Sequence, residues 1–287
     1  DLELLSVGGY SPLTGFMGKA DYERVVAEQR LASGTFWPLP VVLPVTPGEG
    51  VAEGSSVALR DVYGNLLAFL QIEEIYRPDK KAEARHAYGT LDRKHPAVAY
   101  LDRIPDHYAA GRLEVVRTPP HYDFVDLRRT PAELREHFQR IGWTRVVACQ
   151  AHAPLFRTDE ETARRAAVEV NGGLLIQPIV GMTRPGDVDH YTIVRCYRAI
   201  ESKFDDHGGA VLSLLPLATR MAGPREALLR AILGRNYGCS HIIVGRDHAS
   251  PGDDSSSNPF YEPNAAWEAL ATYRGEIGVN SIEAKPM

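Results

Sequence analysis

The sequence predicts an α/β protein in which a mostly β N-terminal part precedes a parallel sheet covered by helices. Residues 144–149 form a short apolar run rich in β-branched side chains, which is typical of a buried strand. Residues 158–170 follow with the apolar spacing of a helix, and residues 150–157 connect the two. A second apolar run, residues 241–245, leads into a polar loop. Strands that alternate with helices in this way require crossover connections and a sheet covered on both faces.

The N-terminal part, residues 1–118, is predicted to be mostly β with some helix. A helix is expected over residues 21–31, where Asp21 can cap its start. Strands are expected over residues 40–45, 55–60 and 66–76, with a turn at Tyr63-Gly64-Asn65. Three glycines near the N-terminus are expected in tight turns: Gly8, Gly9 and Gly15.

Residues 82–108 are rich in His, Arg and Asp. A metal site built from His86, His95 and His107 is conceivable, but the spacings are loose, so a solvated helix and loop is favoured. The prolines at 119 and 120 mark the boundary segment, residues 117–122. The predicted domains are therefore residues 1–118 and residues 119–287.

The sequence of the second domain contains clear signals for helix N-termini. Thr130-Pro131-Ala132-Glu133 combines an N-cap, a first-turn proline and a third-position carboxylate, and Pro224 follows Gly223 at another helix start. A capping box is also expected between Thr158 and Glu161. The remaining expected elements are strands over residues 174–180 and 210–217, a turn at 185–187, and helices from Tyr191 and over residues 264–273, the last capped by Asn264.

Asp189 and His190 could form an acid–base pair. Adjacent residues of a strand point to opposite faces, so a structural role is favoured.

Composition excludes several classes of partner. The chain has 287 residues, a net charge of −5 and no basic block, which argues against nucleic acid and against an anionic membrane surface. No apolar run is long enough to span a bilayer. Three cysteines without metal-ligand spacing, all in or beside apolar segments, favour reduced thiols and a cytoplasmic setting. Cys149 is expected to be a buried structural thiol.

Two loops at the carboxyl ends of predicted strands are the candidate ligand site. The first, residues 150–157, leads into a helix N-terminus, where backbone N–H groups can bind an anion. The second carries Arg246, Asp247 and His248 in a row. Open α/β sheets bind ligands at this edge, although an ordinary strand–helix turn without a ligand remains an alternative for the first loop.

Three long segments resemble the ATP sulfurylases (sulfate adenylyltransferases). They are GGYSPLTGFM from Gly8, LLIQPIVGMTRPGDVDHYTIVRCYRA from Leu174 and AGPREALLRAILGRNYGCSHIIVGRDHASPG from Ala222. The resemblance covers almost the whole chain. That family joins sulfate to the α-phosphate of ATP, giving adenylyl sulfate (APS) and pyrophosphate. The resemblance implies a PUA-like β domain followed by a Rossmann-like nucleotidyltransferase domain, and a further small C-terminal subdomain that this sequence lacks.

The first loop departs from the family's motif, Gln-Thr-Arg-Asn-Pro-x-His-x-x-His-Glu. This chain keeps Gln150, Pro154 and Glu160. The other motif positions hold different residues: Ala151, His152 and Ala153 stand for Thr, Arg and Asn, and Phe156 and Asp159 stand for the two histidines.

These replacements predict a site without catalytic residues. His152 is mostly neutral near pH 7, Phe156 donates no hydrogen bond, and Asp159 brings negative charge where a triphosphate would lie. Losing one such donor typically costs roughly 100- to 1000-fold in rate. By their match to the family, the expected nucleotide- or APS-binding residues are Gln150, His152, Gly245, Arg246, Asp247, His248 and Ala249. No metal or cofactor is expected. Mg-ATP is expected to bind only if the site is active.

Three functions follow from the resemblance. The first is an inactive sulfurylase module that binds adenine nucleotide or APS weakly and serves as an assembly platform for an APS kinase, as a homo-oligomer. The second is an active sulfate adenylyltransferase with a reworked site. The third is a different nucleotidyltransferase in which His152 or His248 takes over.

Overall fold

The structure is a computed structural model that describes residues 1–181, 188–201, 204, 209–253 and 256–284. Its contacts divide the chain into two compact units. Unit 1 comprises Asp1–His121 together with Ser250–Phe260. Unit 2 comprises Tyr122–Ala249 and Tyr261–Met287. None of the described helices is long and apolar enough to cross a bilayer.

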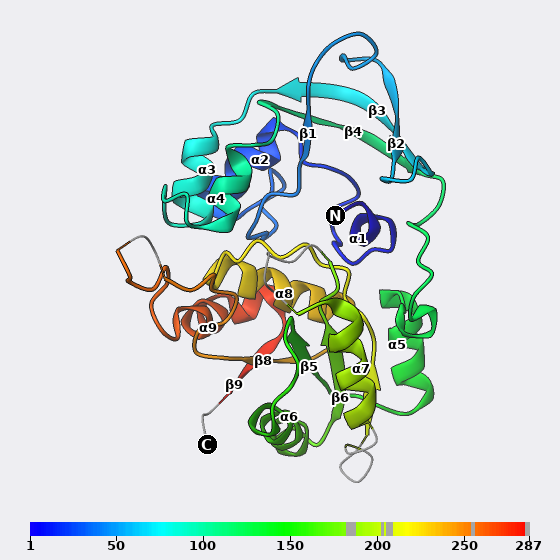
Figure 1. Cartoon of the computed structure of the whole chain (residues 1–287), viewed down its shortest axis with the longest axis vertical. Helices are drawn as coiled ribbons and strands as arrows, with labels where there is room; N and C mark the ends of the chain where they lie inside the picture. Colours follow the sequence, from blue (N-terminus) through cyan, green and yellow to red (C-terminus); the bar gives the residue numbers. More distant parts are fainter. Residues whose placement is uncertain (182–187, 202–203, 205–208, 254–255, 285–287) are drawn as a thin grey trace. The chain divides into compact units, whose positions relative to one another are not determined.

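Unit 1 is built on a four-stranded antiparallel sheet in the order β1-β4-β3-β2 (Figure 1). Its strands are β1 (Leu43–Val45), β2 (Ser56–Arg60), β3 (Leu66–Tyr76) and β4 (His107–Val115). Strand β4 was not predicted from the sequence. Gly111 interrupts its pattern: the residue has φ +155°, and a Cβ there would lie 1.9 Å from the carbonyl oxygen of Gln71. Only glycine lets the two backbones approach this closely.

The helices of unit 1 are α1 (Leu2–Ser6), α2 (Lys19–Glu28), α3 (Lys80–Ala87) and α4 (Pro96–Leu101). The predicted cap of α2 is wrong, because the helix begins after Gly18. Asp21 Oδ1 instead accepts a hydrogen bond from the backbone N–H of Ala32 at 2.6 Å. The helix ends at Glu28 because Gln29 takes a left-handed conformation, with φ 58°.

The expectation of a solvated segment over residues 82–108 is wrong at its two most informative positions. Glu83 is 2% exposed and its Oε2 accepts from the hydroxyls of Tyr22 at 2.8 Å and Tyr108 at 3.2 Å. His95 is fully buried, and its Nδ1 accepts from Ala97 N–H at 3.2 Å at the start of α4. Its ring packs against Phe260, with centroids 5.0 Å apart. His95 is therefore a capping and packing residue.

Unit 2 contains a five-stranded parallel sheet in the order β7-β6-β5-β8-β9. Its strands are β5 (Val146–Ala151), β6 (Gly173–Pro178), β7 (Ala210–Leu212), β8 (His241–Val244) and β9 (Asn280–Glu283). The chain starts in the middle at β5, runs outward to β7 and then returns to β8 on the other side. This order confirms the predicted Rossmann-like sheet, and its direction reverses between β5 and β8.

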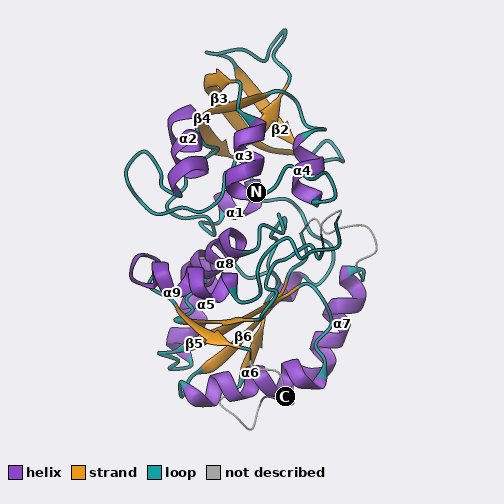
Figure 2. Cartoon of the chain, turned by 90° about the vertical axis from the view of Figure 1, so that its left-hand side faces the viewer, coloured by secondary structure: helices purple, strands orange, loops and turns teal. Residues whose placement is uncertain are grey.

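Helices cover both faces of this sheet (Figure 2). They are α5 (Pro131–Arg140), α6 (Arg157–Glu169), α7 (His190–Glu201), α8 (Pro224–Asn236) and α9 (Ala265–Ile277), with a 3-10 turn, η1 (Val125–Leu127). Helices α6 and α7 share a buried core with alternate residues of β5 and β6, including Val147, Cys149, Leu174 and Ile176. The intervening strand residues point to the opposite face, where α8 and α9 lie.

The predicted caps differ in outcome. The capping box at Thr130 is confirmed: Thr130 N–H donates to Glu133 at 2.7 Å, and Glu133 N–H donates to the Thr130 hydroxyl at 3.3 Å. The box between Thr158 and Glu161 is wrong, because Glu161 pairs with Arg165 at 2.7 Å. Asn264 stands at the start of α9 but makes no side-chain capping bond.

One further strand bound needs correction. Strand β7 ends at Leu212 rather than at residue 217, and β9 was not predicted. Cys149 is buried as expected, Cys239 is also buried, and Cys196 is exposed on α7. The turn predicted at residues 185–187 lies outside the described residues.

Candidate functional site

The two candidate loops leave the sheet at the same edge. Strands β5 and β8 are parallel neighbours, with Val147 opposite His241, so their carboxyl ends lie together. When protonated, His152 in the first loop contributes to the lowered pKa of His248 in the second. The structure therefore brings the two predicted loops together at the point where the strand order reverses.

The first loop is fixed by its backbone. Ala151 is the last residue of β5, and its carbonyl accepts from Ile179 N–H at 2.8 Å. The carbonyl of Ala153 accepts from the hydroxyl of Tyr197 at 2.9 Å. Gln150, the first residue of the predicted loop, lies within β5 and is 6% exposed. The loop is thus tied to β6 and to α7.

The helix start after this loop is occupied by the chain's own carboxylate. Phe156 is the N-cap residue of α6, and it is 70% exposed. Asp159 Oδ2 accepts from the Phe156 backbone N–H at 2.9 Å, and Glu160 is also in the first turn. Burial and, to a smaller extent, the negative charge of Asp159 together raise the pKa of the Cys149 thiol to about 12. Two carboxylates in the first turn offset the positive end of the helix dipole. This helix start therefore attracts an anion much less than the dipole alone would.

The second loop exposes its charges and buries its imidazole. Arg246 and Asp247 side chains are 71% and 61% exposed and stand 3.7 Å apart, a pairing that contributes little in water. The Arg246 carbonyl accepts from Asn264 N–H at 2.9 Å, and the Ala249 carbonyl accepts from Gly223 N–H at 3.1 Å. Gly245 has open space around it, and Ala249 takes a positive φ of 58°.

His248 is neutral at physiological pH. The residue is partly exposed, but its Nε2 is screened from solvent and has no hydrogen-bond partner in the described part of the chain. Burial, with the positive charges of Arg230 and His152, lowers the pKa of His248 to about 3. The imidazole can donate or accept a hydrogen bond but carries no charge to attract an anion.

A buried ion pair on α8 was missed by the sequence analysis. Arg230 donates to Glu226 Oε1 from Nε at 3.0 Å and from a terminal nitrogen at 2.5 Å, and the side chains are 3% and 1% exposed. Glu226 Oε2 accepts from the backbone N–H groups of Arg220 at 2.7 Å and Ala222 at 3.3 Å. Two opposite charges one turn apart in a largely apolar helix were the signal that could have found the pair.

Gln177 was also missed. It lies opposite Gln150 on the neighbouring strand, and Gln150 Nε2 donates to Gln177 Oε1 at 3.0 Å. Gln177 is fully buried. A Cβ added at Gly234 of α8 would lie 3.9 Å from Gln150 Nε2, so the amide pair faces α8. A glutamine inside an apolar strand was the signal that could have found it.

Asp189 and His190 lie at the start of α7 and not in the strand from which their structural role was predicted. Asp189 accepts from the backbone N–H of Thr192 at 2.9 Å and from its hydroxyl at 2.8 Å. His190 Nε2 lies 2.8 Å from Asp123 Oδ2. The two side chains therefore engage different partners at the start of α7.

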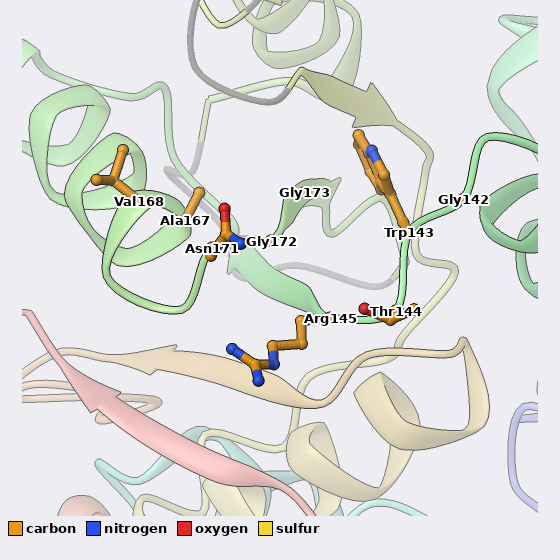
Figure 3. A pocket seen from close by; sticks show the side chains of 9 residues that line it. All are labelled: Gly142, Trp143, Thr144, Arg145, Ala167, Val168, Asn171, Gly172 and Gly173. Atoms are coloured by element: carbon orange, nitrogen blue, oxygen red, sulfur yellow. The ribbon is translucent and has the colours of Figure 1, made fainter.

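A pocket of about 410 Å³ lies at the opposite edge of the sheet. It is lined by residues before β5 and between α6 and β6: Gly142, Trp143, Thr144, Arg145, Ala167, Val168, Asn171, Gly172 and Gly173. Figure 3 shows the indole of Trp143 on one side, Asn171 on the other and the Arg145 side chain between them. Arg145 donates to the Val170 carbonyl at 2.9 Å, which satisfies the end of α6. Because this pocket adjoins the amino ends of β5 and β6, it is separate from the candidate site.

Comparison with known proteins identifies relatives of both parts of the chain. The family model described as ATP-sulfurylase matches residues 125–287, and the PUA-like domain model matches residues 1–118. The sulfate adenylyltransferase of Emericella nidulans is 48% identical over 99% of this chain and 50% of its own length. That of Neurospora crassa is 46% identical over 100% of this chain and 51% of its own length. The chain thus spans about half the length of these relatives.

A solved structure is also similar. The hexameric APS kinase from Thiobacillus denitrificans is 34% identical, with a TM-score of 0.75, over 100% of this chain and 49% of that chain.

The neutral state of His248 predicts a pH dependence of stability. Between its folded pKa of about 3 and the ordinary value of about 6.5, the unfolded chain binds a proton that the folded chain does not. Stability contributed by this group is therefore lost as pH falls, by about 2 kcal/mol at about pH 5. The free energy of unfolding can be measured with urea at about pH 8 and at about pH 5. Its decrease between the two pH values should be about 2 kcal/mol larger in the wild type than in His248→Gln. Equal losses in the two proteins would contradict the assignment.

Proposed function

The chain belongs to the ATP-sulfurylase family, and from that premise we propose that its own site does not catalyse sulfate adenylylation. We propose that it serves sulfate activation as a nucleotide-binding and assembly module, with an APS kinase as its partner. The observation that carries this proposal is the start of α6, where Asp159 occupies the N-cap N–H and Phe156 extends a side chain without polar atoms.

The physical reason lies in the charge that the family's reaction develops. Pyrophosphate leaves as an anion, and such transition states are stabilised by donors and positive charges already in place. In this site Asp159 and Glu160 add negative charge, His248 is neutral, and Arg230 is matched by Glu226. These side chains therefore do not supply the positive charge that would stabilise the departing pyrophosphate, and this supports an inactive site.

An active sulfate adenylyltransferase with a reworked site is the second candidate, favoured by the 48% identity to a protein of that name. Arg246, with its exposed side chain, is the cation this candidate would use. A different nucleotidyltransferase, in which His152 or His248 acts, is the third candidate. A His248 that stays neutral down to about pH 3 supplies no positive charge to it.

Weak ligand binding is part of the proposal. The backbone of residues 245–249 is held at both ends, by Asn264 N–H on Arg246 and by Gly223 N–H on Ala249. A preformed loop lowers the ordering cost of binding, so adenine nucleotide or APS can bind without turnover.

The central test is an assay of pyrophosphate release with ATP, Mg²⁺ and sulfate. We expect no sulfate-dependent release above background, because the donors that stabilise the leaving group are missing. Phe156→His combined with Asp159→His should also be inactive, because the cation at position 152 would still be absent. A sulfurylase from a relative, such as that of Neurospora crassa, is the positive control. Steady sulfate-dependent release by the wild-type chain would refute the proposal.

The assembly part of the proposal has a surface to support it. The turn between β2 and β3 exposes 93% of Val62 and 85% of Tyr63. Asp61 Oδ1 fixes this turn by accepting from the N–H groups of Tyr63 at 2.9 Å and Asn65 at 2.8 Å. Exposed apolar side chains on a rigid turn are suited to a protein interface, because little entropy is lost on binding. The similar APS kinase from Thiobacillus denitrificans is hexameric, so we propose a homo-oligomer for this chain too.

Light scattering tests the assembly. We expect the wild type to be oligomeric at micromolar concentration and Val62→Ser/Tyr63→Ser to shift toward smaller species. Val168→Ser, which removes a 59% exposed apolar side chain from α6, is the control and should leave the mass unchanged. A strictly monomeric wild type would contradict the homo-oligomer, and an unchanged double variant would exclude this turn.

A further inference from the structure

The pocket at the amino edge of the parallel sheet has the lining of a ligand site. Its volume of about 410 Å³ falls within the range of pockets that hold small molecules. Its lining includes the side chains of Trp143, Arg145 and Asn171 but no Asp or Glu, and Figure 3 shows these three side chains around it. The chemistry of the pocket therefore depends on these three groups and on the backbone beside them.

The carbonyl groups at the end of α6 are already bonded. The backbone N–H groups of Asn171 and Gly172 donate to the carbonyls of Val168 and Ala167, each at 3.0 Å, which closes the helix in a Schellman motif. The guanidinium of Arg145 donates to the next carbonyl, as described above. These bonds use three oxygens that could otherwise have bound a cation.

The side chains of the pocket instead leave hydrogen-bond donors for a ligand. Arginine carries five N–H donors, and within the described residues Arg145 makes one side-chain hydrogen bond and no ion pair. The indole N–H of Trp143 and the side-chain amide of Asn171 make no hydrogen bond with that part of the chain. The pocket thus offers several donors and one positive charge.

The charge of Arg145 reaches its neighbours without being cancelled. His241 begins β8, the strand beside β5. Burial, followed by the positive charges of Arg145 and Arg274, lowers the pKa of His241. Glu169, exposed near the end of α6, acts in the opposite direction with a smaller effect. The electrostatic field at this edge is therefore positive, which favours an anion.

The pocket wall at Trp143 is rigid. The indole stacks on Phe138, with ring centroids 5.6 Å apart and planes at 21°. A Cβ at Gly173 would lie 2.2 Å from the indole ring, and one at Gly172 would lie 2.5 Å from the Arg145 carbonyl oxygen. Only glycine permits these two approaches. A wall that is fixed in this way lowers the ordering cost of binding.

We propose that this pocket is a ligand site separate from the two candidate loops, and that it binds a small organic anion through Arg145 and Asn171. The planar fork of a guanidinium fits a carboxylate and a phosphate group equally well. The volume of the pocket leaves room for an organic part beside Trp143. The inference does not depend on the proposed function, because none of these residues belongs to the candidate site.

Tryptophan fluorescence of the whole chain tests the inference in a buffer of low ionic strength. The probes are succinate, glycerol phosphate, inorganic phosphate and uncharged glycerol. We expect at least one of the two organic anions to bind with a Kd of about 1 mM, inorganic phosphate to bind at least about threefold more weakly, and glycerol to give no response. The tighter of the two organic anions identifies the preferred charged group. Trp143→Phe should abolish the response, although Trp37 and Trp267 remain.

Two variants test the residues that would hold the anion. Arg145→Gln should weaken binding at least about fivefold, a moderate loss because Arg145 is exposed to solvent. Asn171→Gly should weaken it about threefold without disturbing the fold, because the residue has φ 48° and glycine accepts that conformation. Arg112→Gln on β4 removes another exposed arginine and is the matched control, which should leave the affinity unchanged.

Four results would overturn the inference. The first is no response to either organic anion at about 10 mM. The second is inorganic phosphate binding as tightly as both, which would indicate an adventitious ion only. The third is unchanged affinity in the folded Arg145 and Asn171 variants. The fourth is a loss of affinity in Arg246→Gln instead, which would place the anion at the second candidate loop.

Discussion

The buried ion pair between Glu226 and Arg230 is the interaction on which the candidate site depends. Both side chains are almost completely screened from water on α8, a helix buried along most of its length. Glu226 also accepts from the backbone of Arg220 and Ala222, and Arg230 lies close enough to lower the pKa of His248. One pair thus holds the segment before α8 and acts on the loop after β8. Removing one partner of such a pair typically costs about 3 to 5 kcal/mol.

The same pair sets the electrostatics of the site. The charge of Arg230 is matched by Glu226, and His248 and the paired amides of Gln150 and Gln177 are neutral. Helix α6, which begins at Arg157, carries Asp159 and Glu160 in its first turn. The two loops leave the sheet at the reversal of strand order, which is where open α/β sheets bind ligands, and Asp159 and Glu160 add negative charge beside the first loop.

Local patterns predicted most of the elements that surround the site. Strands β5, β6 and β8 are apolar runs, and α5 and α8 begin with a proline in the first turn, so sequence was sufficient for them. Strand β4 was missed because its backbone bends at Gly111, where pairing with β3 decides the conformation. The loops were located correctly, but Gln177 and Arg230 were not. The strand register places Gln177 opposite Gln150, and the packing of α8 buries Arg230 with Glu226. Both features arise from tertiary structure and cannot be predicted from local sequence patterns.

The most direct measurement is the ratio of AMP to adenosine affinity in Glu226→Gln. This change keeps an oxygen that can accept from the backbone of Arg220 and Ala222, but it leaves the charge of Arg230 unmatched. If charge balance controls the site, AMP should gain at least about tenfold over adenosine relative to the wild type. A folded variant with the wild-type ratio would show that the Glu226–Arg230 pair does not control the relative affinities for AMP and adenosine.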